Sequence, residues 1–382
     1  MESRKEEYPL ALTFDDILLV PSFADFSRED IILSTSLTRN IKLETPFVSS
    51  PMDTVTESKL AIVLAKEGGI GIIHRNLKVD DQADEVSVVK KKGLLVGAAI
   101  GVSDGYKERL EALVKAKTDV IVLDSAHGWT TKFKETLAFI KNKYKTLDVI
   151  VGNIATFAAA SDFCKSGADG LRVGMGPGAI CTTRIISGMG YPQATAISET
   201  VRAAKKYKIP VIADGGIKHS GDIVKALALG ASTVMMGSFF ASAKESPGRV
   251  RKFKRNEVPS RFRSIVNGKK TYLFKEYRGM GSVASMQHGA KIKSEDEYHG
   301  KSYKDRVLVA EGVEGLVPVK GTVKELLDQA IGGIKSGFYY VGARSIPELQ
   351  RKAEFIRITQ ASLQESHPHD VFITNPGVNY SI

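Results

Sequence analysis

The chain has 382 residues, of which 43% are hydrophobic and 25% charged. This balance is typical of a globular protein rather than of a disordered or fibrous one. The formal charge is +11 and the pI is near 9.3, but Lys and Arg are spread along the sequence without a dense basic arm, which argues against a nucleic acid as the principal ligand. A basic balance equally suits a site that attracts phosphorylated small molecules.

No apolar run approaches the length of a membrane span, and the chain contains only two cysteines, Cys164 and Cys181. We therefore expect a cytoplasmic protein without a membrane partner, because so few cysteines fit a reducing compartment. Cys164 falls on an expected amphipathic helix, where it is interpreted as a small core residue. The two thiols are not expected to form a disulfide.

Eight short apolar segments rich in β-branched residues recur along the chain, and helical patterns such as 159–166 and 222–229 separate most of them. The segments are 47–50, 69–74, 96–101, 119–125, 149–154, 169–173, 211–214 and 233–236. Continuous apolar strands are covered on both faces, which is typical of parallel sheets. Eight such units predict an α/β fold, a TIM (β/α)8 barrel that forms one domain over 1–382, with a doubly wound open sheet as the alternative.

Polar and glycine residues follow most of these strands, at the end where a barrel carries its catalytic groups. Asp124 and Ser125 end the fourth strand, residues 214–217 follow the seventh, and Gly237 and Ser238 follow the eighth. Loops after the last two strands of a barrel commonly bind phosphate through backbone amides. The Asp214 carboxylate is suited to accept hydrogen bonds from a ribose diol. Together these residues predict a site for a nucleoside monophosphate.

Cys181 lies in a glycine-rich loop, 174–184, directly after the expected strand 168–173. A thiol in this position at the end of a parallel strand has no obvious packing role and is placed for chemistry. Its loop amides and the nearby Arg184 would favour the thiolate, which is the nucleophilic form. Cys181 is therefore the candidate nucleophile.

Long motifs resemble the inosine-5'-monophosphate (IMP) dehydrogenase and GMP reductase family, and the resemblance covers essentially the whole chain. They are GMGPGAICTTRIISGMGYPQ at 174–193, SSPMDTVTE at 49–57, GGIGIIHRN at 68–76, DSAHG at 124–128, IADGGI at 212–217, YRGMGS at 277–282, EGVEG at 311–315 and ESHPHD at 365–370. Many members of the family carry an inserted pair of cystathionine-β-synthase repeats. Residues 77–93 leave no room for that regulatory module, so the chain resembles the members without it.

The resemblance implies covalent chemistry at C2 of the purine. Cys181 would attack C2 of IMP, a hydride would pass to NAD, and water would then release xanthosine monophosphate (XMP). Thr183 and Glu311 match the residues that the family uses for proton handling beside the adduct. The fold would add a mobile catalytic flap at about 283–320 and a C-terminal extension, and the protein would form a homotetramer.

The resemblance also assigns the binding residues. The ribose and phosphate contacts match Ser49, Asp214, Gly216, Gly237, Ser238 and Tyr277, and the purine contacts match Met280, Gly281 and Glu311. The contacts to NAD, or NADP, match Asp124, Ser125 and Gly174. A potassium ion, K⁺, would be held by the carbonyls of Gly174, Gly176 and Cys181, together with Glu365, Ser366 and His367 of an adjacent subunit. Oxygen-only ligands suit such a hard cation.

Three departures from the family pattern bear on the reaction. Ala179 stands where the family usually has Ser, which removes one phosphate hydrogen bond worth about 1 kcal/mol. Tyr191 resembles the reductase branch. In the flap, Glu297 occupies the position of the Arg that serves the dehydrogenase as a base, although Tyr298 is retained and Arg306 is a candidate replacement. We expect the dehydrogenase, with GMP reductase, which makes IMP and ammonia from GMP and NADPH, as the alternative.

Two further classes stay open from the sequence. A flavin-dependent barrel oxidoreductase would share the glycine-rich phosphate loops, and a yellow colour of the purified protein would reveal it. With its flap altered, the chain could also be a nucleotide-binding paralogue that has lost catalysis. Absence of turnover with any purine nucleotide, despite IMP binding, would identify that case.

Overall fold

Eight parallel strands close into a barrel in the computed structural model, which describes residues 8–260, 262, 266, 269–292, 309–371, 373 and 380. The strands are β4 (Phe47–Ser49), β5 (Ile70–Ile73), β6 (Val96–Ile100), β7 (Val120–Asp124), β8 (Asp148–Ile154), β9 (Gly170–Val173), β10 (Val211–Asp214) and β11 (Thr233–Met236). The barrel closes because β11 pairs with β4 and β9 pairs with β10. The predicted TIM barrel is confirmed, and closure rules out the open sheet.

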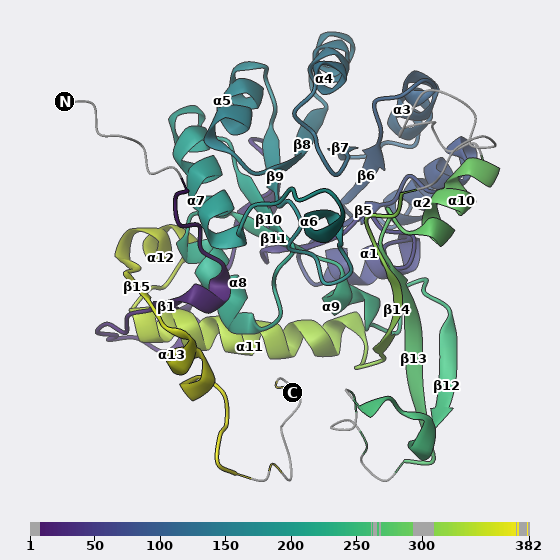
Figure 1. Cartoon of the computed structure of the whole chain (residues 1–382). Helices are drawn as coiled ribbons and strands as arrows, with labels where there is room; N and C mark the ends of the chain where they lie inside the picture. The colour runs from purple at the N-terminus through teal and green to yellow at the C-terminus, as the bar shows by residue number, and fades with distance from the viewer. Residues whose placement is uncertain are drawn as a thin grey trace.

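Helices surround this barrel on all sides (Figure 1). They are α1 (Ser58–Lys66), α2 (Val79–Lys90), α3 (Tyr106–Lys115), α4 (Thr131–Lys143), α5 (Phe157–Lys165), α7 (Gln193–Ala204), α8 (Ser220–Ala228) and α11 (Val323–Val341). The strands are almost entirely buried, since they face side chains inside the barrel and helices outside it. Residues 77–93 contain α2 alone, which joins β5 to β6.

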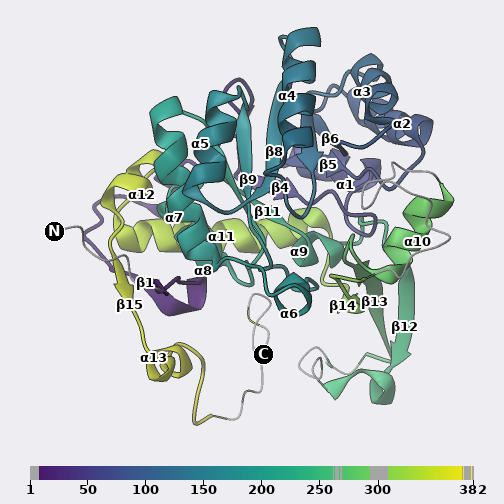
Figure 2. The same cartoon turned by 45° about the horizontal axis from the view of Figure 1, so that its top comes forward.

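A three-stranded antiparallel sheet projects from the barrel beside the short helix α9 (Ser238–Ala241), and its strands come between α9 and α11 in the sequence (Figures 1 and 2). It consists of β12 (Val250–Lys254), β13 (Thr271–Arg278) and β14 (Glu314–Pro318). Helix α10 (Val283–Lys291) follows β13. The segment expected as a flap, 283–320, thus begins with α10 and contains β14, and residues 293–308 between them lie outside the described residues.

Segments from the N-terminal and the C-terminal parts of the chain pair on one side of the barrel. Strand β1 (Ile17–Leu19) pairs with β15 (Phe355–Arg357), which follows α12 (Ile346–Lys352). Helix α13 (Gln360–Glu365) packs against the 3₁₀ turn η1 (Phe14–Asp16). The two-residue strands β2 (Thr35–Ser36) and β3 (Lys42–Leu43) form a small hairpin. In the described part of the chain, we find no helix with both the length and the apolar character that crossing a membrane requires.

Candidate active site

A cavity of about 2170 Å³ opens at the carboxyl ends of the barrel strands. It brings together most of the residues that the sequence singled out: Asp124, Ser125, Gly174, Gly176, Cys181, Thr183, Asp214, Gly216, Gly237, Ser238, Tyr277, Met280, Gly281 and Glu311. These residues come from the loops after β7, β9, β10 and β11 and from the segments that flank α10. A cavity of this size accommodates a nucleotide together with a second large ligand.

The nucleophile candidate stands at the start of a chain of three side chains. The Cys181 Sγ lies 3.3 Å from the Thr183 Oγ1, which donates a hydrogen bond of 2.8 Å to the Glu311 Oε2. Thr183 begins the short helix α6 (Thr183–Ile186), whereas Glu311 lies 128 positions further along the chain. A carboxylate that can take a proton through a hydroxyl is thereby connected to the position where Cys181 would react.

Backbone pairing holds the cysteine loop against the segment that carries Glu311. The Thr182 amide donates to the Glu311 carbonyl and the Val313 amide to the Ile180 carbonyl, each at 2.9 Å. The Glu311 amide donates to the Gly281 carbonyl at 3.1 Å. These bonds fix the relative positions of the thiol and the carboxylate, so the arrangement depends on the backbone and not on side-chain packing alone.

Arg184 contributes to the shape of the loop in a way that the sequence did not suggest. Its Nη2 donates to the Tyr191 carbonyl at 2.8 Å. Its side chain covers Gly176 and Gly190, where an added Cβ would lie within 3 Å of the arginine stem. Arg184 therefore braces the two ends of the loop, a structural role in addition to the expected effect on the Cys181 thiolate, which stays a prediction.

A buried arginine on β9 links two of the predicted carboxylates. Arg172, which is 8% exposed, forms ion pairs with Asp124 and with Asp214, the latter at 2.9 Å. Burial alone would lower the pKa of Arg172, but the two carboxylates raise it above its ordinary value. The Asn153 Nδ2 also donates to Asp214 Oδ2 at 2.9 Å, which leaves Oδ1 for a ligand. Sequence reasoning missed Arg172, although a charged residue inside a buried strand was an available signal.

The residues expected at the phosphate lie together, with one correction. The Tyr277 hydroxyl packs against Gly237, where an added Cβ would lie 2.6 Å from the hydroxyl oxygen. Burial raises the pKa of Tyr277 well above its ordinary value, and the Ser238 amide partly opposes this by hydrogen bonding to it. Ser49, in contrast, is fully buried and accepts a hydrogen bond from Thr56. Ser50, the next residue, lines the cavity instead.

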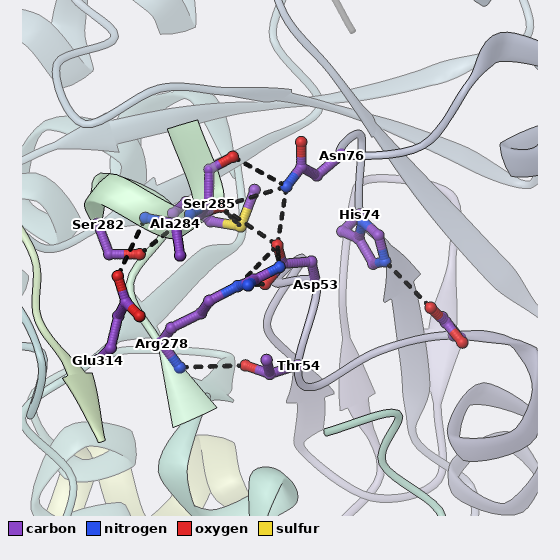
Figure 3. Close-up of polar contacts among 11 residues, drawn as sticks. Asp53, Thr54, His74, Asn76, Arg278, Ser282, Ala284, Ser285 and Glu314 are labelled. Atoms are coloured by element: carbon purple, nitrogen blue, oxygen red, sulfur yellow. Dashed lines mark hydrogen bonds and ion pairs between the residues drawn. The ribbon is translucent and has the colours of Figure 1, made fainter. Parts of the chain in front are cut away.

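An ion pair anchors α10, where the expected flap begins, to the barrel (Figure 3). Both Arg278 Nε and Nη2 donate to the Asp53 carboxylate, the latter at 2.6 Å. The Asn76 Nδ2 donates to the same carboxylate at 2.8 Å and to the Ser285 Oγ at 3.2 Å. Burial would raise the pKa of Asp53, but the hydrogen bonds and charge of Arg278 outweigh it and lower the pKa. The start of the expected flap is thus fixed on the loops after β4 and β5.

The remaining predicted residues either lie outside the described residues or stand apart from the cysteine loop. Glu297, Tyr298 and Arg306 lie outside the described residues. The tail residues Glu365, Ser366 and His367 lie at the end of α13, away from α6 and the cysteine loop in both views (Figures 1 and 2). The carbonyls of Gly176 and Cys181 accept no hydrogen bond from any described residue, whereas Asn153 donates to the Gly174 carbonyl. Unengaged carbonyl oxygens fit a hard cation such as K⁺.

Replacing Gly174 by Ala is expected to destabilise the protein. Its φ of +156° is costly for an L-residue, and the new Cβ would lie 2.1 Å from the Asp214 carbonyl oxygen. We expect a loss of at least about 1–3 kcal/mol in the free energy of unfolding, measured by urea denaturation. The control is Gly332→Ala, in the middle of α11 with open space around it, which should gain about 0.5–1 kcal/mol. Equal stability of the two variants would contradict the strained geometry.

The fold and the site define a barrel enzyme with a half-buried cysteine, Cys181, at the wall of a nucleotide-sized cavity. The family description "IMP dehydrogenase / GMP reductase domain" matches residues 11–369, and the chain belongs to this family. It is 42% identical to the inosine-5'-monophosphate dehydrogenase of Borreliella burgdorferi, over 95% of this chain and 97% of that protein. It is also 42% identical to that of Cryptosporidium parvum, over 97% of this chain and 98% of the relative.

A longer relative shows what this chain lacks. The inosine-5'-monophosphate dehydrogenase of Chlorobaculum tepidum is 36% identical, over 97% of this chain and 98% of the relative. That alignment extends over 501 positions, against 382 residues in this chain, so the relative carries long insertions that are absent here. This difference supports the expectation of a family member without the inserted regulatory repeats.

Proposed function

We propose that the protein is an IMP dehydrogenase, which converts IMP, NAD and water to XMP and NADH in guanine nucleotide synthesis. The observation that carries the proposal is the chain from Cys181 through Thr183 to Glu311 at the wall of the cavity. The relatives compared above, all named as IMP dehydrogenases over nearly their whole length, support the same reaction.

The residues account for each step of that reaction. The Cys181 thiolate adds to C2 of IMP, and the hydride on C2 then leaves with its electron pair for the nicotinamide ring of NAD. The resulting thioimidate is attacked at C2 by water, and the bond from C2 to Sγ breaks to release XMP and the thiol. Thr183 and Glu311 take the proton from the attacking water, because their hydrogen bond connects the reacting centre to a carboxylate.

The cavity walls fit the two substrates at different ends. Asp214 offers its free oxygen to the ribose of IMP, and the phosphate is bound near Gly216, Gly237 and Ser238, with Tyr277 beside them. Met280 and Gly281, next to Glu311, face the purine, whereas Asp124, Ser125 and Gly174 receive NAD. Ala179 lines the cavity without a hydroxyl, so one phosphate hydrogen bond of about 1 kcal/mol is absent.

A K⁺ site and a homotetramer belong to the same proposal. The carbonyls of Gly174, Gly176 and Cys181 would hold K⁺ together with Glu365, Ser366 and His367 of an adjacent subunit. Large exposed apolar side chains support subunit contacts, among them Phe23 at 82% and Ile185 at 86% exposed. Size-exclusion chromatography with light scattering tests the tetramer.

Both cysteines are free thiols, which supports a reducing, cytoplasmic location.

The purified protein is expected to form NADH when given IMP and NAD, followed as absorbance at 340 nm in the presence of K⁺. The competing reaction is that of GMP reductase, which Tyr191 and the replacement of the flap Arg by Glu297 favour. NADPH oxidation with GMP, without NADH formation from IMP, would identify the reductase. A protein that binds IMP but turns over no purine nucleotide would be a non-catalytic paralogue.

A further inference from the structure

Lys275 on β13 is a buried ammonium group that is satisfied by backbone oxygens instead of a carboxylate. It is 3% exposed, and its Nζ donates to the carbonyls of Ala243 and Lys244, each at 2.9 Å. It also donates to the carbonyl of Ser246 and, at 3.0 Å, to the Ser246 Oγ. All four acceptors belong to the turn that follows α9. The Lys275 ammonium group therefore holds residues 243–246 of this turn together by hydrogen bonds.

Tyr277 contacts the opposite end of the same helix. Residues 275 and 277 point to the same face of β13, because side chains alternate along a strand. The Tyr277 hydroxyl lies against Gly237 and the Ser238 amide, where α9 begins. The strand thus holds α9 at both ends, with Tyr277 at its start and Lys275 at the turn beyond its last residue.

Further hydrogen bonds within the turn close it. The Ser246 Oγ, which has one hydrogen to donate, lies within hydrogen-bond distance of two carbonyls, that of Ala241 at 2.9 Å and that of Ala243 at 3.0 Å. Burial, together with the charge of Lys59, lowers the pKa of Lys275 to about 8, although Glu245 opposes the change. The group still carries three hydrogens at neutral pH. A side chain without donors would leave the carbonyls of Lys244 and Ser246 without a hydrogen-bond donor among the described residues, at about 1–3 kcal/mol for each unpaired group.

We propose that Lys275 is a positioning residue for the nucleotide phosphate: it fixes the turn after α9, so that Gly237 and Ser238 at the start of α9 keep the geometry that binds the phosphate. The proposal rests on the proposed function, because it takes the nucleotide to be IMP. Lys275 does not contact the substrate. Its effect passes through α9 and should therefore appear in phosphate affinity and not in the chemical steps.

The test is Lys275→Met, which keeps the length and apolar stem of the side chain but removes every donor. The matched control is Lys252→Met on the neighbouring strand β12, where the lysine is exposed. We expect Lys275→Met to raise the KM for IMP at least tenfold while kcat changes less than threefold. The inhibition constant of inorganic phosphate, measured against IMP, should rise similarly, whereas that of inosine, which lacks the phosphate, should stay within twofold.

The outcomes separate this proposal from the proposed function. If the parent protein neither binds nor oxidises IMP, the proposed function fails. If the parent is active but Lys275→Met has the same KM for IMP as Lys252→Met, the positioning role is wrong. It is also wrong if Lys275→Met raises the inhibition constant of inosine as much as that of inorganic phosphate. If Lys275→Met does not fold by circular dichroism, Ser246→Ala provides the test, with an expected two- to fivefold rise in the KM for IMP. An unchanged KM in that variant overturns the proposal.

Discussion

Replacing Cys181 by Ala is expected to lower the rate of NADH formation by about 10⁴-fold or more, because no other group can form the covalent bond to C2. The thiol is half-buried and connected to Thr183, and no second cysteine lines the cavity in the described residues. IMP binding should remain, since the ribose and phosphate contacts come from other loops. The measurement is steady-state NADH formation, with IMP binding followed by calorimetry.

The chain offers a matched control in its other cysteine. Cys164 is 3% exposed on α5, and burial raises its pKa to about 11, so it is a poor nucleophile. Cys164→Ala should keep full activity and lose about 1 kcal/mol of stability. Iodoacetamide should alkylate Cys181 alone, and IMP should protect it. Retention of more than a tenth of the activity in Cys181→Ala would refute covalent catalysis at this residue.

The barrel could be predicted because each of its strands is marked by a pattern within its own few residues. Each of the eight strands is a short apolar run, and burial on both faces removes the alternation that an exposed sheet would show. The sheet β12–β14 was not predicted, because β12 carries mostly exposed and charged residues and gives no apolar run. Its pairing with β13 depends on contacts between segments that are distant in sequence.

Site residues on glycine-rich loops after strands could be predicted from the sequence. Site residues whose role depends on the direction of a side chain could not. Cys181, Asp214 and Ser238 follow strand ends, so the fold alone places them at the cavity. Ser49, the last residue of β4, is buried, whereas the adjacent Ser50, just past the strand, lines the cavity, and the sequence does not distinguish the two. Arg172 and Lys275 lie within strands, and their partners come from other elements. No sequence pattern reports such partners.

Replacing Glu311 by Gln is expected to slow the second half of the reaction more than the first. The Gln side chain can still accept a hydrogen bond from Thr183 but cannot take up a proton, so attack by water on the thioimidate loses its base. The resemblance places Glu297 at the position of the family's flap Arg, and on that expectation the Thr183 and Glu311 pair carries this step. Loss of a general base typically costs about 10²–10⁴-fold in rate.

Rapid mixing separates the two halves of the reaction. Glu311→Gln should release a burst of about one NADH per active site at nearly the parent rate, followed by a steady state at least a hundredfold slower. Thr183→Val should behave in the same way, since it breaks the connection between the carboxylate and the reacting centre. The control is Glu314→Gln on β14, whose carboxylate accepts a hydrogen bond only from the Ala284 amide among the described residues. Its rate should change less than about threefold. If the burst and the steady state slow equally in Glu311→Gln, the carboxylate acts in the first half of the reaction. If the steady-state rate of Glu311→Gln equals that of Glu314→Gln, Glu311 has no role in proton transfer.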